Sequence, residues 1–472
     1  MFHSSGTKGS PLKLAARCLC ALTLLMCPLA AEQADWIWSA RYVVTMDGGR
    51  RVIEDGAVAV RGDRIAGVGR RTEIEGRFQA RQRIRAGNAI IAPGLINAHT
   101  HAPMSLLRGV ADDLKLQDWL EKYIFPAESK NVDREFVRWG TRLACLEMAL
   151  GGTTTFADMY YFEDTVAEAT KECGARGVLG QTILNFPAPD AKDFREALEQ
   201  TERFIRRFQG DALVTPAVAP HALYTNTDES LRLSRALANR YGVPLLTHLS
   251  ETRQEREDSI SQRGKTPVAV YEDLGIFQGR TLAAHCVWLD DQDIRRLASG
   301  KVGIAHCPSS NMKLASGVAP VTKMLAAGLP VGLGTDGPAG SNNDFSLMEE
   351  MDLAAKLQKV MTGDPQALTA VQALEMATIG GARALGMENE IGSLEPGKKA
   401  DLIAIGLDGA HAAPLYNVYS QMVYALKASD VEHVMINGRM IVRSRRMLTL
   451  DERRVMAETE KFRQRVAASI AR

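Results

Sequence analysis

Two histidines separated by one residue, His99 and His101, end a short apolar segment of the chain. Alternate side chains of a β-strand share one face, so a His-x-His pair at a strand end directs two imidazoles toward one point. His248 and Asp336, from distant segments, would add a third imidazole and a carboxylate. A shell of nitrogen and oxygen ligands that leaves room for water is typical of a catalytic metal site. The spacing therefore predicts metal-assisted hydrolysis.

Two further residues could handle protons and charge beside such a metal. Glu251 follows His248 by three residues, and a carboxylate just outside the ligand shell can protonate a ring nitrogen and help an amine leave. The alternative is a solvated carboxylate, because Glu251 begins the charged run 251–258. His285 could stabilise the attacking oxygen as a hydrogen-bond donor, or could be a core residue. Asp336 could bind the metal and also hold the proton of its water.

Each candidate ligand stands at the end of a predicted β-strand. Between residues 152 and 336, short apolar segments alternate with helical patterns such as 194–208 and 228–241, as expected of βαβ units in a parallel sheet. Eight such units favour a closed (β/α)8 TIM barrel, in which reactive side chains gather at the carboxyl ends of the strands. The predicted strands end near His101, Asp158, Leu184, Ala219, His248, His285, His306 and Asp336.

A second, smaller domain is predicted from the two ends of the chain. Short strands with Gly-rich turns fill residues 36–85, and residues 400–447 show a similar pattern. We expect these flanks to pair into one small β-sandwich domain. The predicted organisation is a β-domain in two parts, a barrel between them and a charged terminal helix: 32–91 and 396–447, 92–395, and 448–472.

The first 31 residues have the pattern of a signal peptide. Lys8, Lys13 and Arg17 precede the apolar run 18–26, and residues 29–31 offer a small-residue cleavage site. The apolar run is too short to span a bilayer comfortably, which argues against an uncleaved anchor. We expect an exported, periplasmic protein; without a functional leader it would be cytoplasmic.

The composition excludes several classes of function. A chain of 472 residues with 46% hydrophobic residues and a formal net charge of +1 can bury a large core but shows no electrostatic signature of a nucleic-acid partner. Beyond the leader, Cys145, Cys173, Cys286 and Cys307 are too scattered for a disulfide framework or a cysteine zinc site. We expect buried thiols, a small-molecule substrate and no stable membrane span.

Longer motifs around these residues resemble the metal-dependent amidohydrolase superfamily. They are Pro93-Gly-Leu-Ile-Asn-Ala-His-Thr-His101, His248-x-x-Glu251, Ala284-His285-Cys286 and Gly334-Thr-Asp-Gly337. Segments 102–109, 220–225 and 305–314 look most like those of the 5-methylthioadenosine/S-adenosylhomocysteine deaminases. The resemblance extends over essentially all of the chain after the leader.

The resemblance implies one divalent metal in the barrel, usually zinc, bound by His99, His101, His248 and Asp336. Iron or manganese would also suit three imidazoles and a carboxylate. The resemblance also implies that four residues contact the substrate: Glu251, Asp336, Glu128 and His221. The glutamate corresponding to Glu128 holds ribose hydroxyls in the resembling deaminases, and His221 matches a substrate-contacting histidine. The alternatives are a surface helix glutamate and a structural histidine.

These observations predict a hydrolytic deaminase that acts on an adenine-type nucleoside, such as 5′-methylthioadenosine or S-adenosylhomocysteine, and releases ammonia. A guanine or cytosine deaminase, or a triazine hydrolase releasing chloride or an amine, would keep the same site and change the substrate. A barrel without chemistry, used for binding or assembly, is the alternative of another class. Members of the family often associate, so the resemblance leaves homo-oligomerisation open. The role of His306 is also open, between support of the site and a structural hydrogen bond.

Overall fold

The computed structural model describes residues 31–470. The predicted leader, except for its last residue, lies outside the described residues. Within 31–470, no helix is both long enough and apolar enough to cross a membrane.

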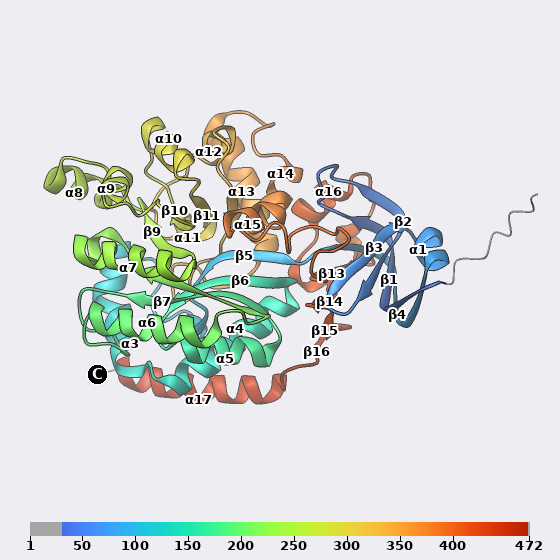
Figure 1. The fold of residues 1–472 in the computed structure, drawn as a ribbon, viewed down its shortest axis with the longest axis horizontal. Coiled ribbons are helices and arrows are strands. Elements are labelled where there is room, and N and C mark those ends of the chain that lie inside the picture. Colours follow the sequence, from blue (N-terminus) through green and yellow to red (C-terminus); the bar gives the residue numbers. More distant parts are fainter. Residues whose placement is uncertain (1–30, 471–472) are drawn as a thin grey trace, which may run out of the picture.

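Eight parallel strands close into a barrel at the centre of the molecule (Figure 1). Neighbouring strands follow one another along the chain, and β12 pairs with β5 through Leu333 and Asn97. The predicted (β/α)8 barrel is confirmed, and its strands end within a few residues of the expected positions. The barrel strands are β5 (Leu95–Thr100), β6 (Thr153–Tyr160), β7 (Arg176–Ile183), β8 (Val214–Pro220), β9 (Leu245–Leu249), β10 (Thr281–His285), β11 (Gly303–His306) and β12 (Val331–Leu333).

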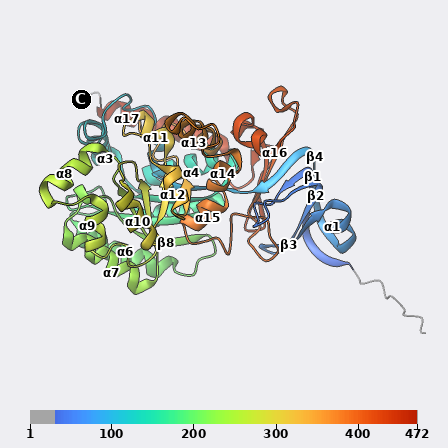
Figure 2. The same ribbon diagram turned by 90° about the horizontal axis from the view of Figure 1, so that it is seen from above.

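Helices cover the outside of the barrel (Figures 1 and 2). Two of them, α6 (Phe194–Phe208) and α7 (Asp228–Tyr241), have the predicted bounds. Each begins after a capping side chain: Asp193 accepts hydrogen bonds from the first turn of α6, and Thr227 does so for α7. The other helices of this layer are α3 (Phe125–Asn131), α4 (Arg134–Leu150), α5 (Glu163–Cys173), α8 (Arg253–Arg263), α9 (Pro267–Asp273), α10 (Asp291–Ser299), α11 (Pro308–Lys313), α12 (Val321–Ala326), α13 (Leu347–Thr362), α14 (Ala370–Met376) and α15 (Ile379–Ala384).

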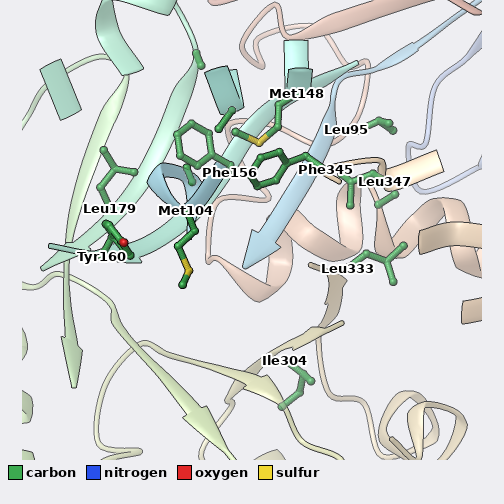
Figure 3. Close-up of a cluster of buried hydrophobic side chains, with 14 of the residues drawn as sticks. Leu95, Met104, Met148, Phe156, Tyr160, Leu179, Ile304, Leu333, Phe345 and Leu347 are labelled. Atoms are coloured by element: carbon green, nitrogen blue, oxygen red, sulfur yellow. The ribbon is translucent and has the colours of Figure 1, made fainter. Parts of the chain in front are cut away.

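Alternation along the strands produces two apolar layers. Ala157 and Met159 of β6 belong to a cluster of mostly small residues contributed by the other barrel strands, which fills the barrel interior. Phe156, which directly precedes Ala157, belongs to the outer layer with Met148 of α4 and Phe345 (Figure 3). Both phenylalanines are fully buried, and burial of such a side chain stabilises the fold by roughly 1.5–3 kcal/mol.

The two ends of the described chain form the predicted β-domain. Its strands make one continuous sheet in the order β16-β15-β14-β13-β4-β1-β2-β3. The sheet curls so that Trp38 of β1 meets His433 of β14 with ring centroids 5.9 Å apart, around an apolar cluster from both ends. The strands are β1 (Glu32–Val44), β2 (Val52–Arg61), β3 (Arg64–Arg70), β4 (Phe78–Pro93), β13 (Leu402–Gly406), β14 (Val431–Ile436), β15 (Arg439–Arg443) and β16 (Arg446–Met447), with α1 (Arg71–Arg77) between β3 and β4.

A buried ion pair joins the sheet to the barrel. Arg176 of β7 donates from Nε and Nη2 to Asp401, at 2.9 and 3.1 Å, just before β13 begins. This two-point geometry fixes the relative position of the two parts. The domain boundaries near residues 92 and 396 stay predictions.

The chain ends in α17 (Glu452–Ile470), which runs along the outside of the barrel (Figure 1). It packs on α3 and α4, with the rings of Phe462 and Phe136 5.8 Å apart. Asn131, the last residue of α3, donates to Ser469 Oγ at 2.7 Å. The terminal helix therefore supports α3, which carries Glu128.

Candidate metal centre and active site

Residues from four barrel strands or their ends meet at one point at the carboxyl end of the barrel. Potential ligand atoms of His99, His248, His285 and Asp336 lie within 4.8 Å of one another. His101 reaches the same point, because its Nε2 lies 3.3 Å from Asp336 Oδ1 and 3.3 Å from His248 Nε2. Five residues thus offer ligand atoms, and His285 differs from the rest because its Nε2 also faces Glu251 Oε2 at 3.8 Å.

Backbone carbonyls fix the orientation of two of these imidazoles. His101 Nδ1 lies 2.7 Å from the carbonyl oxygen of Met159, and His248 Nδ1 lies 2.8 Å from that of His221. Since a carbonyl only accepts, each Nδ1 must carry the hydrogen. In the neutral rings, Nε2 then directs a lone pair at the centre, as a metal ligand requires.

The centre has the electrostatics of a buried, charged site. Burial opposes ionisation of Asp336, yet its contacts with His101 and His99 hold its pKa well below the usual range. Burial also disfavours an imidazolium at His101, but the Asp336 carboxylate raises the His101 pKa to about 9. Burial lowers the pKa of His99 to about 4. The carboxylate at this centre thus requires a compensating positive charge.

The donor set fits a divalent cation. His99 Nε2 is buried and makes no hydrogen bond to any described residue, although it lies 3.4 Å from Asp336 Oδ1. A buried polar atom without a partner is costly, and coordination would satisfy it. Three imidazoles and a carboxylate are ligands that zinc and neighbouring transition metals accept.

Glu251 lies beside the centre rather than within it. The residue is 3% exposed, and its Oε1 has no hydrogen-bond partner among the described residues. Burial raises the pKa of this carboxyl above its ordinary value, although the nearby His285 opposes the shift. The predicted alternative of a solvated carboxylate in a charged run therefore does not describe Glu251. Its position suits a group that takes up and returns a proton.

Two neighbouring residues of α11 hold site residues in place. Ser310 Oγ donates to Asp336 Oδ2 at 2.7 Å, and Asn311 Oδ1 lies 2.9 Å from His285 Nδ1. Because this oxygen accepts, His285 Nδ1 carries a hydrogen, and Nε2 is an acceptor in the neutral ring and a donor only in the imidazolium. Neither residue was predicted to have a role, although both lie in the segment 305–314 that resembles the deaminases.

A cavity opens above the centre. Every predicted site residue except His99 lines this cavity: His101, Glu128, His221, His248, Glu251, His285 and Asp336. His99 lies next to the lining, with its Nε2 3.4 Å from Asp336 Oδ1. The structure thus gathers every predicted site residue in one place.

Glu128 is a buried cavity residue and not a surface helix glutamate. It is 3% exposed, and it accepts hydrogen bonds from Tyr160 at 2.6 Å and Tyr161 at 3.4 Å. Burial raises the pKa of Glu128 to about 7, although the bond from Tyr160 opposes the shift. The two tyrosines were not predicted as site residues; they lie at the end of β6 and just after it.

The remaining two histidines differ in their surroundings. His221 faces the cavity, and its Nδ1 lies 3.1 Å from Thr225 Oγ1. His306 is fully buried, and neither ring nitrogen has a hydrogen-bond partner within residues 31–470. Burial lowers the pKa of His306 to about 3, so the ring is neutral. The structure places only His221 in the cavity.

One wall of the cavity is apolar and was not predicted. It is formed by the segment between β5 and α3, including the π-helical turn Trp119–Ile124. Trp119 Nε1 donates to the carbonyl of Ala339 at 3.0 Å and so ties this wall to the loop after β12. This wall could have been predicted from the apolar residues that precede Glu128 in the sequence. The side chains of this wall are Met104, Leu116, Trp119, Leu120, Ile124 and Phe125.

All four cysteines after the leader are buried and free, as predicted. They therefore take no part in the centre.

An eight-stranded parallel barrel with histidines and an aspartate at its carboxyl end defines a class of metal-dependent hydrolases. The chain belongs to the amidohydrolase family, whose model matches residues 90–441. As an amidohydrolase it is a hydrolase that acts on carbon–nitrogen bonds, and members of this family use a divalent metal.

Relatives with assigned functions cover nearly all of the chain. It is 45% identical over 439 residues to 5-methylthioadenosine/S-adenosylhomocysteine deaminase 1 of Syntrophus aciditrophicus, covering 93% of this chain and 99% of the relative. Among solved structures, an adenosine deaminase from Xanthomonas campestris with bound zinc is 38% identical with a TM-score of 0.91, covering 93% and 100% of the two chains. The zinc complex of an atrazine chlorohydrolase from Arthrobacter aurescens is 25% identical with a TM-score of 0.83, covering 90% and 99%.

Proposed function

We propose that this protein is a hydrolytic deaminase that replaces the exocyclic amine of an adenine-type nucleoside with oxygen and releases ammonia. The observation that carries the proposal is one cavity that combines the histidine and aspartate centre with two buried carboxylates, Glu251 and Glu128. The relatives named above, a methylthioadenosine/adenosylhomocysteine deaminase and an adenosine deaminase, support the same chemistry.

We propose His99, His101, His248 and Asp336 as the ligands of one divalent metal, with zinc as the preferred ion. The choice of zinc is supported by the donor set and by the zinc in the Xanthomonas structure. A divalent cation held there would lower the pKa of a bound water and supply a nucleophile at neutral pH. Iron and manganese are the other ions that this donor set suits.

Residues of this chain then carry out the proton transfers and orient the attacking oxygen. Glu251 Oε1, buried without a partner, can hold a proton and deliver it to the ring nitrogen next to the carbon under attack. Once it has given up this proton, the same carboxyl can take a proton from the attacking water and pass it to the departing amine, so that ammonia leaves as a neutral molecule. His285 Nε2, which faces Glu251, can orient the attacking oxygen while Asn311 holds the ring.

Glu128 is the residue that favours a nucleoside over a free base. An ionised carboxylate accepts from two hydroxyl donors, and in this structure Glu128 already accepts from two tyrosine hydroxyls. A ribose with adjacent 2′ and 3′ hydroxyls offers the same pair of donors. His221, on the same cavity, is proposed as a further substrate contact.

The test is ammonia release by the purified, zinc-loaded protein with adenosine, 5′-methylthioadenosine, guanine and cytosine. We expect turnover of the adenine nucleosides and none of the two free bases. The Glu128→Ala variant should lose nucleoside turnover, since it removes the acceptor for the ribose. Ammonia release from guanine or cytosine alone, or turnover that is insensitive to Glu128→Ala, would refute the nucleoside proposal.

We also propose that the protein is exported. The support is the leader pattern at residues 1–31, with its basic residues, apolar run and small-residue cleavage site. Sequencing the amino terminus of the protein purified from its natural host should find a chain that begins near residue 32. A chain that retains the leader and is recovered with the cytoplasm would contradict this.

A further inference from the structure

The cavity lining has an uneven distribution of charge. Three carboxylates, Glu128, Glu251 and Asp336, face the cavity, but among the described residues that line it there is no lysine and no arginine. An anionic group on a substrate would therefore find no cationic partner inside.

The substrate's orientation follows from the proposed chemistry. The exocyclic amine and the ribose lie on opposite sides of an adenine ring. When the carbon bearing the amine faces Glu251 and the metal centre, the ribose must lie away from them, beside Glu128. The group attached to the 5′ carbon then extends beyond the ribose, past the residues that flank Glu128.

Those flanking residues are apolar. Glu128 follows the turn Trp119–Ile124 and Phe125, which form the apolar wall together with Leu116. The ring of Phe125 lies 5.7 Å from that of Phe186, which is 38% exposed, so this wall extends toward the mouth of the cavity. The region available to a 5′ substituent is thus lined by aliphatic and aromatic side chains.

We infer, building on the proposed function, that the enzyme selects adenine nucleosides whose 5′ substituent is short, uncharged and apolar, such as a methylthio group. It discriminates against nucleosides that carry an amino-acid tail or a phosphate at this position.

The physical reasons are burial and charge. A methylthio group placed against Leu116 and Phe125 buries apolar surface that adenosine's 5′ hydroxyl does not have. A carboxylate or phosphate in the same place would lose water and gain no counter-charge, which is strongly unfavourable. Burial already raises the pKa of Glu128, which shows that this region disfavours negative charge.

The test is a comparison of kcat/KM for four substrates of the zinc-loaded, full-length enzyme: 5′-methylthioadenosine, adenosine, S-adenosylhomocysteine and adenosine 5′-monophosphate. We expect 5′-methylthioadenosine to exceed adenosine by about 10-fold, the scale set by a small apolar group in a fitted pocket. The two charged substrates should be poorer than 5′-methylthioadenosine by on the order of 100-fold or more.

A charge placed in the wall should relax this selectivity. Leu116 is half-buried, so the Leu116→Arg variant can solvate its guanidinium and still fold. We expect the ratio of S-adenosylhomocysteine to 5′-methylthioadenosine turnover to rise by about 10-fold, since arginine binds a carboxylate well. Leu116→Gln, which removes the alkyl surface but adds no charge, should lower 5′-methylthioadenosine turnover and leave S-adenosylhomocysteine turnover unimproved.

The outcomes separate the two proposals. Equal kcat/KM for S-adenosylhomocysteine and 5′-methylthioadenosine would overturn the inference and leave the deaminase proposal standing. Failure of the metal-loaded enzyme to deaminate any of the four would remove both. The inference also falls if Leu116→Gln improves S-adenosylhomocysteine turnover as much as Leu116→Arg does.

Discussion

The mouth of the barrel and the flanking sheet differ in how many of their buried polar side-chain atoms lack a hydrogen-bond partner. At the mouth, His99 Nε2, Glu251 Oε1 and Ser250 Oγ are buried without hydrogen-bond partners. In the described strands of the flanking sheet, Trp38 Nε1 is the one buried side-chain atom in that condition. Unpaired buried groups cost stability, so the mouth retains an arrangement that folding alone would not favour.

The backbone shows the same contrast between function and stability. Ser250, His285 and Asp336 each have a positive φ, at 52°, 70° and 63°, which non-glycine residues rarely adopt. They lie just after β9, at the end of β10 and after β12, and the side chains of His285 and Asp336 contribute to the centre. The flanking sheet also contains positive-φ residues, such as Asp55 and Asn437, but these do not line the cavity, and the sheet buries apolar side chains such as Ile65 and Leu402 in its core. We conclude that the mouth carries function at a cost in stability that the packed parts of the fold offset.

Loss of the charged metal ligand should affect the mouth of the barrel most strongly. Asp336→Asn should reduce kcat/KM by on the order of 1,000-fold or more and lower the metal content, because the anionic ligand is lost. It should leave the free energy of unfolding of the metal-free protein nearly unchanged or higher. Activity and metal analysis, with the exposed Asp291→Asn as control, measure this. Retention of more than a tenth of the activity would contradict the proposed ligand set.

Removing the proton carrier should separate chemistry from metal binding. Glu251→Gln keeps the size of the side chain but cannot transfer a proton, so kcat should fall by roughly 100-fold to 10,000-fold. The metal content should stay that of the wild type. Glu257→Gln, on the exposed side of α8, is the matched control. If Glu251→Gln and Glu257→Gln have similar kcat, Glu251 is not the proton carrier.

The flanking sheet should respond in the reverse way. Ile65 is 2% exposed in the core of the sheet, so Ile65→Ala should lower the free energy of unfolding by about 2–5 kcal/mol. The milder Ile65→Val should cost about 0.5–1.5 kcal/mol. Urea denaturation measures both, and kcat/KM at 25 °C should change less than 2-fold because the sheet does not line the cavity. A large loss of kcat/KM in the folded variants would show that the two regions are coupled.

The smallest expected effect is a pH dependence from Glu128. Its pKa is about 7, and only the ionised form accepts from two ribose hydroxyls. As the pH falls below 7, protonation removes that acceptor, so kcat/KM for a nucleoside should fall by about 5-fold between pH 7 and pH 6 beyond any change shared with the variant. Glu128→Gln, which is uncharged at every pH, should lack this component. Identical pH profiles for the two proteins would exclude Glu128 as the titrating group.

Much of the fold and the centre could be predicted because the relevant signals are local. The metal-ligand candidates end short apolar runs, which marks the carboxyl ends of barrel strands, and α6 and α7 begin after capping residues. A parallel barrel brings all such strand ends to one face, so the convergence of His99, His248 and Asp336 followed from topology.

The parts that could not be predicted depend on contacts between distant segments. Trp119 fixes the apolar wall by bonding to Ala339, which lies 220 positions later in the chain. Ser310 similarly acquires its role only when β12 brings Asp336 beside it. No periodicity or spacing in either segment encodes these partners.

The most direct test of the central claim is a crystal structure of the purified protein with data collected at the absorption edge of its metal. We predict one ion per chain, about 2.0–2.2 Å from ligand atoms of His99, His101, His248 and Asp336, with Glu251 close by but not bound. An ion bound elsewhere, or a fully metal-supplemented crystal without an ion at these four side chains, would contradict the account.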